Sequence, residues 1–61
     1  MPSEWTYTCG NNRYCVVERF GRLIVQRQDW LGRTFISYAG DLAEATVLIR
    51  LDAKSSRLIA A

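Results

Sequence analysis

The sequence predicts an α+β fold, a four-stranded antiparallel β-meander with one C-terminal α-helix packed on a face of the sheet. Between residues 5 and 38, four runs rich in Val, Ile, Thr and aromatic residues alternate with short turn-forming segments. From residue 41 onward, helix-forming residues follow a residue that caps helices well. At 61 residues, the chain is expected to form a single small domain spanning 1–61.

The first two strands are expected at residues 5–9 and 13–19. In the first, Trp5, Tyr7 and Cys9 alternate with polar residues, which is the pattern of a half-buried strand. Residues 10–12 are Gly-Asn-Asn, which tolerate a positive φ, so a turn is expected between the two strands.

The third and fourth strands are expected at residues 22–28 and 33–38. Gly21 interrupts the chain before the third strand, and residues 29–32 have the composition of a loop. Consecutive strands joined by such short connections pair with their neighbours, which gives the antiparallel meander.

The centre of the sheet is apolar on both faces. Residues 15–17 are Cys-Val-Val and residues 23–25 are Leu-Ile-Val, whereas a sheet with one solvated face alternates cleanly. One helix covers one face, so the sequence predicts that the other face is covered by something else.

A helix is expected from Leu42 to about Ala53. Asp41 is a good N-cap, and Glu44 follows three residues later as in a capping box. The apolar residues of this segment are spread around the helix axis, which favours burial between the sheet and a second subunit. In the alternative, the helix ends near Ala45 and residues 46–51 form a strand in a hairpin with residues 57–60, giving an all-β small barrel.

The composition also predicts a homodimer. Hydrophobic residues make up 49% of the chain, yet a domain of about 60 residues buries only about 60% of the surface that its unfolded chain exposes. A second copy is the simplest molecule to cover the excess.

Catalysis is poorly supported by the residue types present. The chain has no histidine, its acidic residues are scattered, and it contains no nucleophile motif or phosphate-binding loop. We therefore expect no enzyme activity, no cofactor and no small-molecule substrate. The net charge of +2 is too small to indicate nucleic acid by itself.

The two cysteines, Cys9 and Cys15, are too few for a zinc site without histidine. Two partly buried thiols are expected rather than a disulfide. The N-terminus has no signal-peptide pattern, and the longest apolar run is residues 47–49, so a cytoplasmic location without membrane contact is expected.

Arginines on the second and third strands could form a basic face if the register allows it. With a two-residue turn at Phe20-Gly21, Arg19 faces Arg22 and Arg13 lies on the same face. With a three-residue loop, Arg22 lies opposite Glu18 and the set is divided between the faces. Turn chemistry favours the longer loop, because Gly21 then takes the left-handed position.

The loop around Trp30 is the best candidate site. Trp and Arg are frequent energetic anchors of interfaces, so the predicted binding residues are Arg22, Arg27, Trp30, Leu31 and Arg33. In the alternative, Trp30 folds back and plugs the core. The expected function is protein–protein docking by a small accessory, regulatory or inhibitor-type protein, of a kind that phages and plasmids carry. The alternative function is a nucleic-acid-binding module that uses the Arg-bearing strands.

Overall fold

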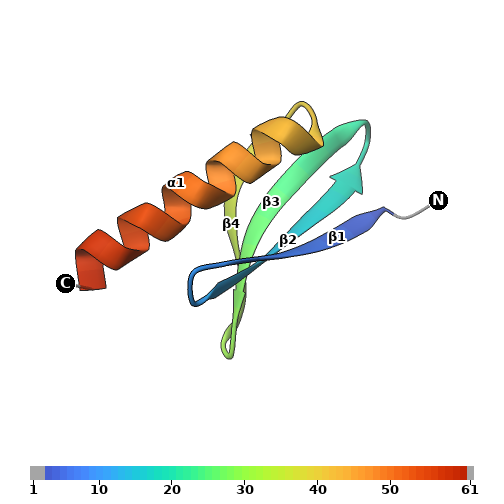
Figure 1. The fold of residues 1–61 in the computed structure, drawn as a ribbon. Coiled ribbons are helices and arrows are strands. Elements are labelled where there is room, and N and C mark those ends of the chain that lie inside the picture. The colour runs from blue at the N-terminus through green and yellow to red at the C-terminus, as the bar shows by residue number, and fades with distance from the viewer. Residues whose placement is uncertain (1–2, 61) are drawn as a thin grey trace.

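The computed structural model describes residues 3–60, with the side chains of residues 3–55, and it confirms the predicted α+β meander (Figure 1). The elements in chain order are β1 (Glu4–Cys9), β2 (Asn12–Arg19), β3 (Arg22–Asp29), β4 (Gly32–Ala39) and α1 (Leu42–Ala60). The strands pair in the order β1-β2-β3-β4, each antiparallel to its neighbour. Each predicted strand lies within the observed one, which is one or two residues longer.

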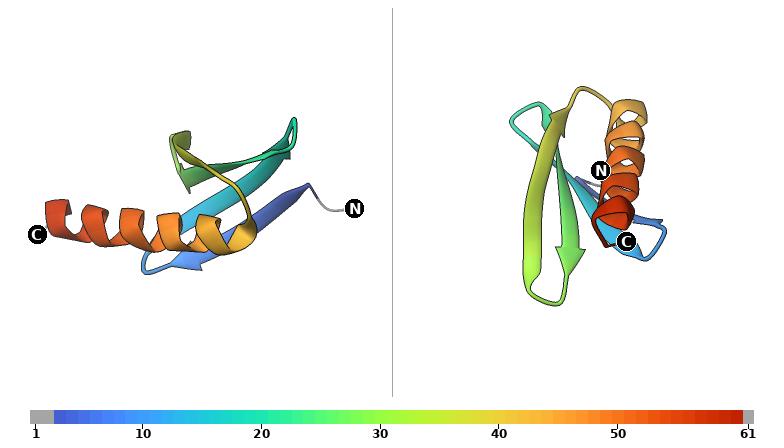
Figure 2. Two further views of the ribbon diagram at one scale, coloured as in Figure 1. Left: turned by 90° about the horizontal axis from the view of Figure 1, so that it is seen from above. Right: turned by 90° about the vertical axis from the view of Figure 1, so that its left-hand side faces the viewer.

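The sheet is strongly twisted and α1 lies across one of its faces (Figure 2). The N-terminal half of the helix covers the sheet, and its C-terminal end extends beyond it in both figures. We call the opposite side of the sheet the helix-free face.

The small-barrel alternative is wrong, because residues 46–51 are helical and the backbone of residues 57–60 continues the same helix. Burial of Ala45, Ile49 and Ala53 against the sheet favours continuation of the helix past Ala45, and a cap fixes where the helix begins. The Glu44 N–H donates to Asp41 Oδ1 at 2.8 Å, and Glu44 Oε1 accepts from the Gly40 N–H at 2.8 Å. This resembles the expected capping box, except that Glu44 reaches Gly40 rather than the cap residue itself.

The hydrophobic core lies between α1 and the sheet. The helix contributes Ala45, Ile49 and Ala53, spaced four residues apart on one stripe. The sheet contributes side chains from β2, β3 and β4: Tyr14, Val16, Leu23, Val25 and Ala39. Small residues at two of the three helix positions let the backbone of α1 approach the sheet closely.

The register between β2 and β3 differs from the one that turn chemistry favoured. Arg19 pairs with Arg22 across a two-residue turn, so the three-residue loop is wrong. Phe20 has a φ of 53° and Gly21 a φ of 75°, both in the left-handed region. The side chain of Phe20 is fully exposed, so no packing of its ring offsets the local strain of this backbone.

Burial beneath the helix explains why the shorter turn wins. In the observed register, Leu23 and Val25 face α1 and are almost completely buried. A slip of one residue would turn both outward and place Arg22, Ile24 and Gln26 against the helix, so the core would lose one apolar side chain and gain two polar ones. Burying one such apolar side chain contributes about 1.5–3 kcal/mol, more than the roughly 1–2 kcal/mol that a left-handed Phe20 costs.

A β-bulge interrupts β4. Val25 pairs with Ser37 and the next residue, Gln26, pairs with Phe35, so Ile36 is left without a partner. In a regular strand, residues 35 and 38 would point to opposite faces. The extra residue places Phe35 and Tyr38 on the same, helix-free face, where their ring centroids are 5.1 Å apart.

A polar network ties α1 to the sheet at the edge of the core. The hydroxyl of the buried Tyr14 donates to Asp52 Oδ2 at 2.7 Å and accepts from Asn12 Nδ2 at 3.1 Å. Arg27 Nη1 bonds the same carboxylate at 3.0 Å. Burial raises the pKa of Tyr14 above its ordinary value of 10.0, and the hydrogen bond to Asp52 is the second largest cause of the increase.

We expect Tyr14→Phe to lower the free energy of unfolding by about 1–3 kcal/mol at pH 7, because a buried hydrogen bond to a carboxylate is lost. Folding raises the Tyr14 pKa, so the contribution of this hydroxyl to the free energy of unfolding is present below pH 10. The contribution is lost at higher pH, where the tyrosine of the unfolded chain ionises. Urea titrations at several pH values above neutrality measure both effects. The wild type should lose stability above pH 10 more steeply than Tyr14→Phe, and equal slopes would contradict this explanation.

Phe20→Asn should raise the free energy of unfolding by about 1 kcal/mol, because Asn adopts the left-handed conformation more readily than Phe. The exposed ring of Phe20 contributes no packing that this change would remove. Urea denaturation measures the difference, and Arg19→Asn, beside the turn, serves as the control. A less stable Phe20→Asn protein would show that the turn is not strained.

Candidate functional site

Trp30 and Leu31 form the two-residue turn between β3 and β4, and both point into solvent. Trp30 is 90% exposed and Leu31 is 75% exposed. The alternative in which Trp30 plugs the core is therefore wrong. The apolar side chains beneath α1 are packed without it, and the turn projects from the end of the sheet (Figure 1).

The side chain of Asp29 holds this turn in shape. Its Oδ1 accepts hydrogen bonds from the backbone N–H of Leu31 at 2.9 Å and of Gly32 at 3.1 Å. Asp commonly stabilises turns in this way. Trp30 is thus presented on a fixed backbone, which lowers the entropy that is lost when a partner binds.

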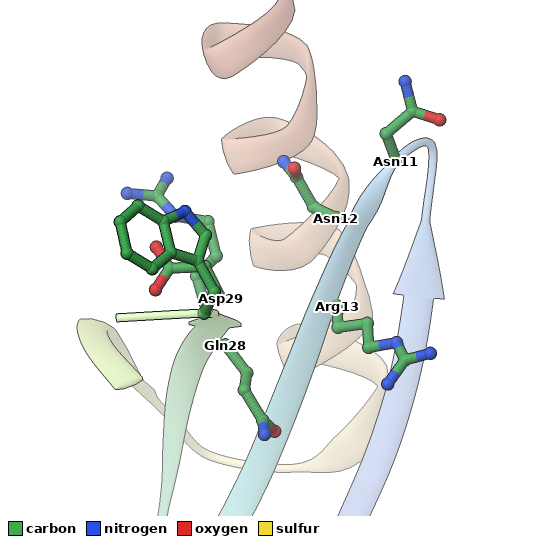
Figure 3. A pocket seen from close by; sticks show the side chains of 7 residues that line it. Asn11, Asn12, Arg13, Gln28 and Asp29 are labelled. Carbon is green, nitrogen blue, oxygen red and sulfur yellow. The ribbon is translucent and has the colours of Figure 1, made fainter. Parts of the chain in front are cut away.

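An open hollow of about 510 Å³ lies beside the turn (Figure 3). Figure 3 shows Asn11 of the β1–β2 turn and Asn12 at the start of β2 on one side of it, and Gln28 with Asp29 at the end of β3. Trp30, Arg13 and Arg27 complete the lining. The hollow is therefore lined by both polar groups and an indole ring.

The structure does not bring the five predicted binding residues together. Arg27 lies on the helix side of the sheet and is bound to Asp52, although it still borders the hollow. Arg22 begins β3, at the opposite end of the sheet from Trp30. Arg33 follows the turn closely and lies on the helix-free face, opposite Gln28.

The helix-free face is curved inwards. Arg33 and Glu4, which lie on the two outer strands, form an ion pair with 3.0 Å between Nη2 and Oε1. Cys15 and Val17 point to this face and are only 2% and 7% exposed, although no helix covers them. The curvature of the sheet therefore supplies part of the cover that the sequence led us to expect from another molecule.

A strip of cations and aromatic rings follows β4 on this face, and we call it the β4 strip. Arg22 Cζ lies 5.6 Å from the centroid of the Tyr38 ring, and Tyr38 packs edge-to-face with Phe35. Both rings remain more than half exposed. In order along the sheet, the strip consists of Arg19, Arg22, Tyr38, Phe35 and Arg33.

Sequence reasoning missed the two aromatic residues of this strip. Regular alternation places Phe35 and Tyr38 on opposite faces, and only the bulge at Ile36 unites them. The one available signal was the adjacent apolar pair Phe35-Ile36, which breaks the alternation of a half-buried strand.

The two cysteines are unbridged, as expected. Cys9 contacts the core on the helix side, whereas Cys15 points to the helix-free face and donates to Gln28 Oε1 at 3.1 Å. In the part of the chain that the structure describes, no group of three or more His, Cys, Asp or Glu side chains could hold a metal ion. Over the same residues, α1 lacks the apolar length needed to cross a membrane.

Comparisons with known proteins return no match. No family model matches the chain, and neither curated proteins nor solved structures show significant similarity to it. The function of the chain therefore has to be inferred from the geometry of the turn and of the helix-free face.

Proposed function

We propose that this chain is a non-enzymatic binding protein that docks on another protein through the Trp30–Leu31 turn. The observation that carries the proposal is the 90% exposure of Trp30 on a turn fixed by Asp29. Tryptophan offers a large apolar surface with a hydrogen-bonding group and is enriched among the energetic anchors of interfaces, so an indole held in solvent on a turn fixed by Asp29 supports docking there. Its role is accessory, regulatory or inhibitory.

The surroundings of Trp30 fit this role. Leu31 extends the apolar contact, and the hollow beside the turn offers a complementary depression. Arg33 lies at the rim, where arginine is enriched in interfaces. The absence of histidine from the whole chain weakens any proposal of acid–base catalysis. Two free thiols, Cys9 and Cys15, support a reducing, cytoplasmic location.

Trp30→Ala should weaken partner binding by about 30-fold or more, which is the loss expected for an interface hot spot. Its free energy of unfolding should change by less than about 0.5 kcal/mol, because the side chain is outside the core. Affinity capture from nuclease-treated lysate of the organism that encodes the chain, followed by titration of the captured partner, measures the first quantity.

Phe20→Ala is the matched control, because Phe20 is also an almost completely exposed aromatic residue, on the turn at the opposite end of the sheet. Unchanged binding by Trp30→Ala would refute docking at this turn. A large loss of stability would instead assign Trp30 to the fold.

We also propose that two copies associate through the outer side of α1. Val47 and Leu51 lie one turn apart on this side and are 51% and 57% exposed. Their spacing supports a helix–helix contact between subunits. Sedimentation equilibrium should give twice the monomer mass of 7.0 kDa, and Val47→Glu with Leu51→Glu should return it to the monomer. A monomeric wild type at high micromolar concentration would overturn this proposal.

The nucleic-acid alternative is favoured by one specific observation, the register of β2 and β3. The two-residue turn places Arg13, Arg19 and Arg22 on the same face, which is the arrangement that this function requires. Among the residues whose side chains the structure describes, the ion pairs are Arg27–Asp52 and Arg33–Glu4, so these three guanidinium groups have no acidic partner. Such a module binds phosphates in a strongly salt-dependent way.

A further inference from the structure

We propose that the β4 strip binds single-stranded nucleic acid, with bases stacked on Phe35 and Tyr38 and phosphates held by Arg19, Arg22 and Arg33. The inference rests on the nucleic-acid alternative and is independent of docking at the Trp30–Leu31 turn. It names residues that the sequence did not single out and the class of nucleic acid that they fit.

The order of side chains along the strip matches a single strand. Two arginines lie at one end, the two rings lie in the middle, and Arg33 lies at the other end. Gln28, the partner of Arg33, is six residues from Arg22 along β3, which corresponds to about 20 Å. A single strand carries charge along its backbone and offers unpaired bases beside it, so it can contact both kinds of group at once.

The exposure of the rings supports stacking. Phe35 is 53% exposed and Tyr38 is 54% exposed, and their interplanar angle of 62° leaves ring surface facing solvent. In a duplex, each base face is covered by its neighbours, so these rings would have no base to stack on. Bases of a single strand have free faces and stack on aromatic side chains or on arginine.

The charge of the strip favours a polyanion over a second copy as the occupant. A symmetric contact would bring two copies of the same basic strip face to face, each with Arg19, Arg22 and Arg33. Like charges facing each other across an interface are strongly unfavourable. Glu4, the acidic group at this site, is already engaged by Arg33. A polyanion, by contrast, is complementary to the whole strip.

Fluorescence anisotropy with labelled oligothymidylate and oligouridylate of about 12 nucleotides tests the inference. Both should bind at low salt, and a duplex of the same length should bind more weakly. The slope of log affinity against log salt should be about −2, from roughly −0.7 for each of three phosphates contacted. Tighter binding of one oligonucleotide would identify RNA or DNA as the preferred strand and would still support the inference.

Two sets of variants separate stacking from charge. Phe35→Leu and Tyr38→Leu keep an apolar side chain, and each should weaken binding by roughly 5- to 100-fold without changing the salt slope. Arg19→Ala with Arg22→Ala should weaken binding and reduce the slope by about 1.4. Arg50→Ala is the matched control for charge, because Arg50 is also exposed but lies on α1, away from the strip, and it should change neither quantity.

Three outcomes would overturn the inference. The first is undiminished binding by both leucine variants, provided that circular dichroism shows them to be folded. This result would refute stacking and indicate a general polyanion site, and the nucleic-acid alternative would survive. Displacement of the oligonucleotide by polyglutamate at equal charge concentration would indicate an acidic protein as the ligand. Failure of the wild type to bind any oligonucleotide at low salt would refute both the inference and the alternative function.

Discussion

Burial of Leu23 and Val25 beneath α1 is the constraint on which the rest of the structure depends. The two side chains fix the pairing of β2 with β3, since any slip of one residue would expose them. The same pairing determines which side chains of β2 and β3 lie on the helix-free face. Arg19 and Arg22 lie there as neighbours because Leu23 must face the helix. The basic character of this face is therefore a consequence of core packing, and it comes with a left-handed Phe20 at the turn.

The position of α1 depends on a second, polar constraint. The Asp52 carboxylate accepts hydrogen bonds from the Tyr14 hydroxyl and the Arg27 guanidinium, which lie on adjacent strands. These hydrogen bonds fix one end of the contact between α1 and the sheet, and Ala45 and Ile49 pack along the rest of that contact. Arg27 is thereby removed from the set of residues that a partner could use freely. Arg27 on β3 and Arg33 on β4 flank the Trp30–Leu31 turn. Of the two, Arg33 is the one that lies on the helix-free face.

Local signals predicted the elements, whereas contacts between distant residues decided the site. Alternation, the Gly-Asn-Asn turn and the Asp41 cap depend on neighbouring residues, and the predicted strands and helix start agree with the structure. The register of β3 depends on burial under a helix that begins 21 residues after Gly21, so turn preference alone gave the wrong answer. The pairing of Tyr14 with Asp52, 38 residues apart, leaves no pattern in the local sequence, and the only local trace of the bulge at Ile36 is the adjacent apolar pair Phe35-Ile36. The end of α1 was also placed too early, near Ala53, because the polar residues that follow do not terminate a helix by themselves.

Apart from Phe20 at the β2–β3 turn, the large exposed apolar residues are distributed over three separate regions, and this separation makes the proposals compatible. Val47 and Leu51 lie on the outer side of α1, Phe35 and Tyr38 lie on the helix-free face, and Trp30 lies at the end of the sheet. A second copy on the helix leaves the β4 strip accessible, because the two surfaces are on opposite sides of the sheet (Figure 2). The strip and the Trp30–Leu31 turn adjoin at Arg33, where a docked protein and a bound strand would come close together.

Arg33 can remain paired with Glu4 or release it for a phosphate, so ligand binding at this corner would compete with the ion pair that joins β1 to β4. Because that pair is exposed, it stabilises the fold by at most about 1 kcal/mol. A guanidinium group forms strong, charge-assisted hydrogen bonds to phosphate oxygens. Opening the ion pair would therefore cost little compared with the stabilisation that Arg33 derives from binding a phosphate.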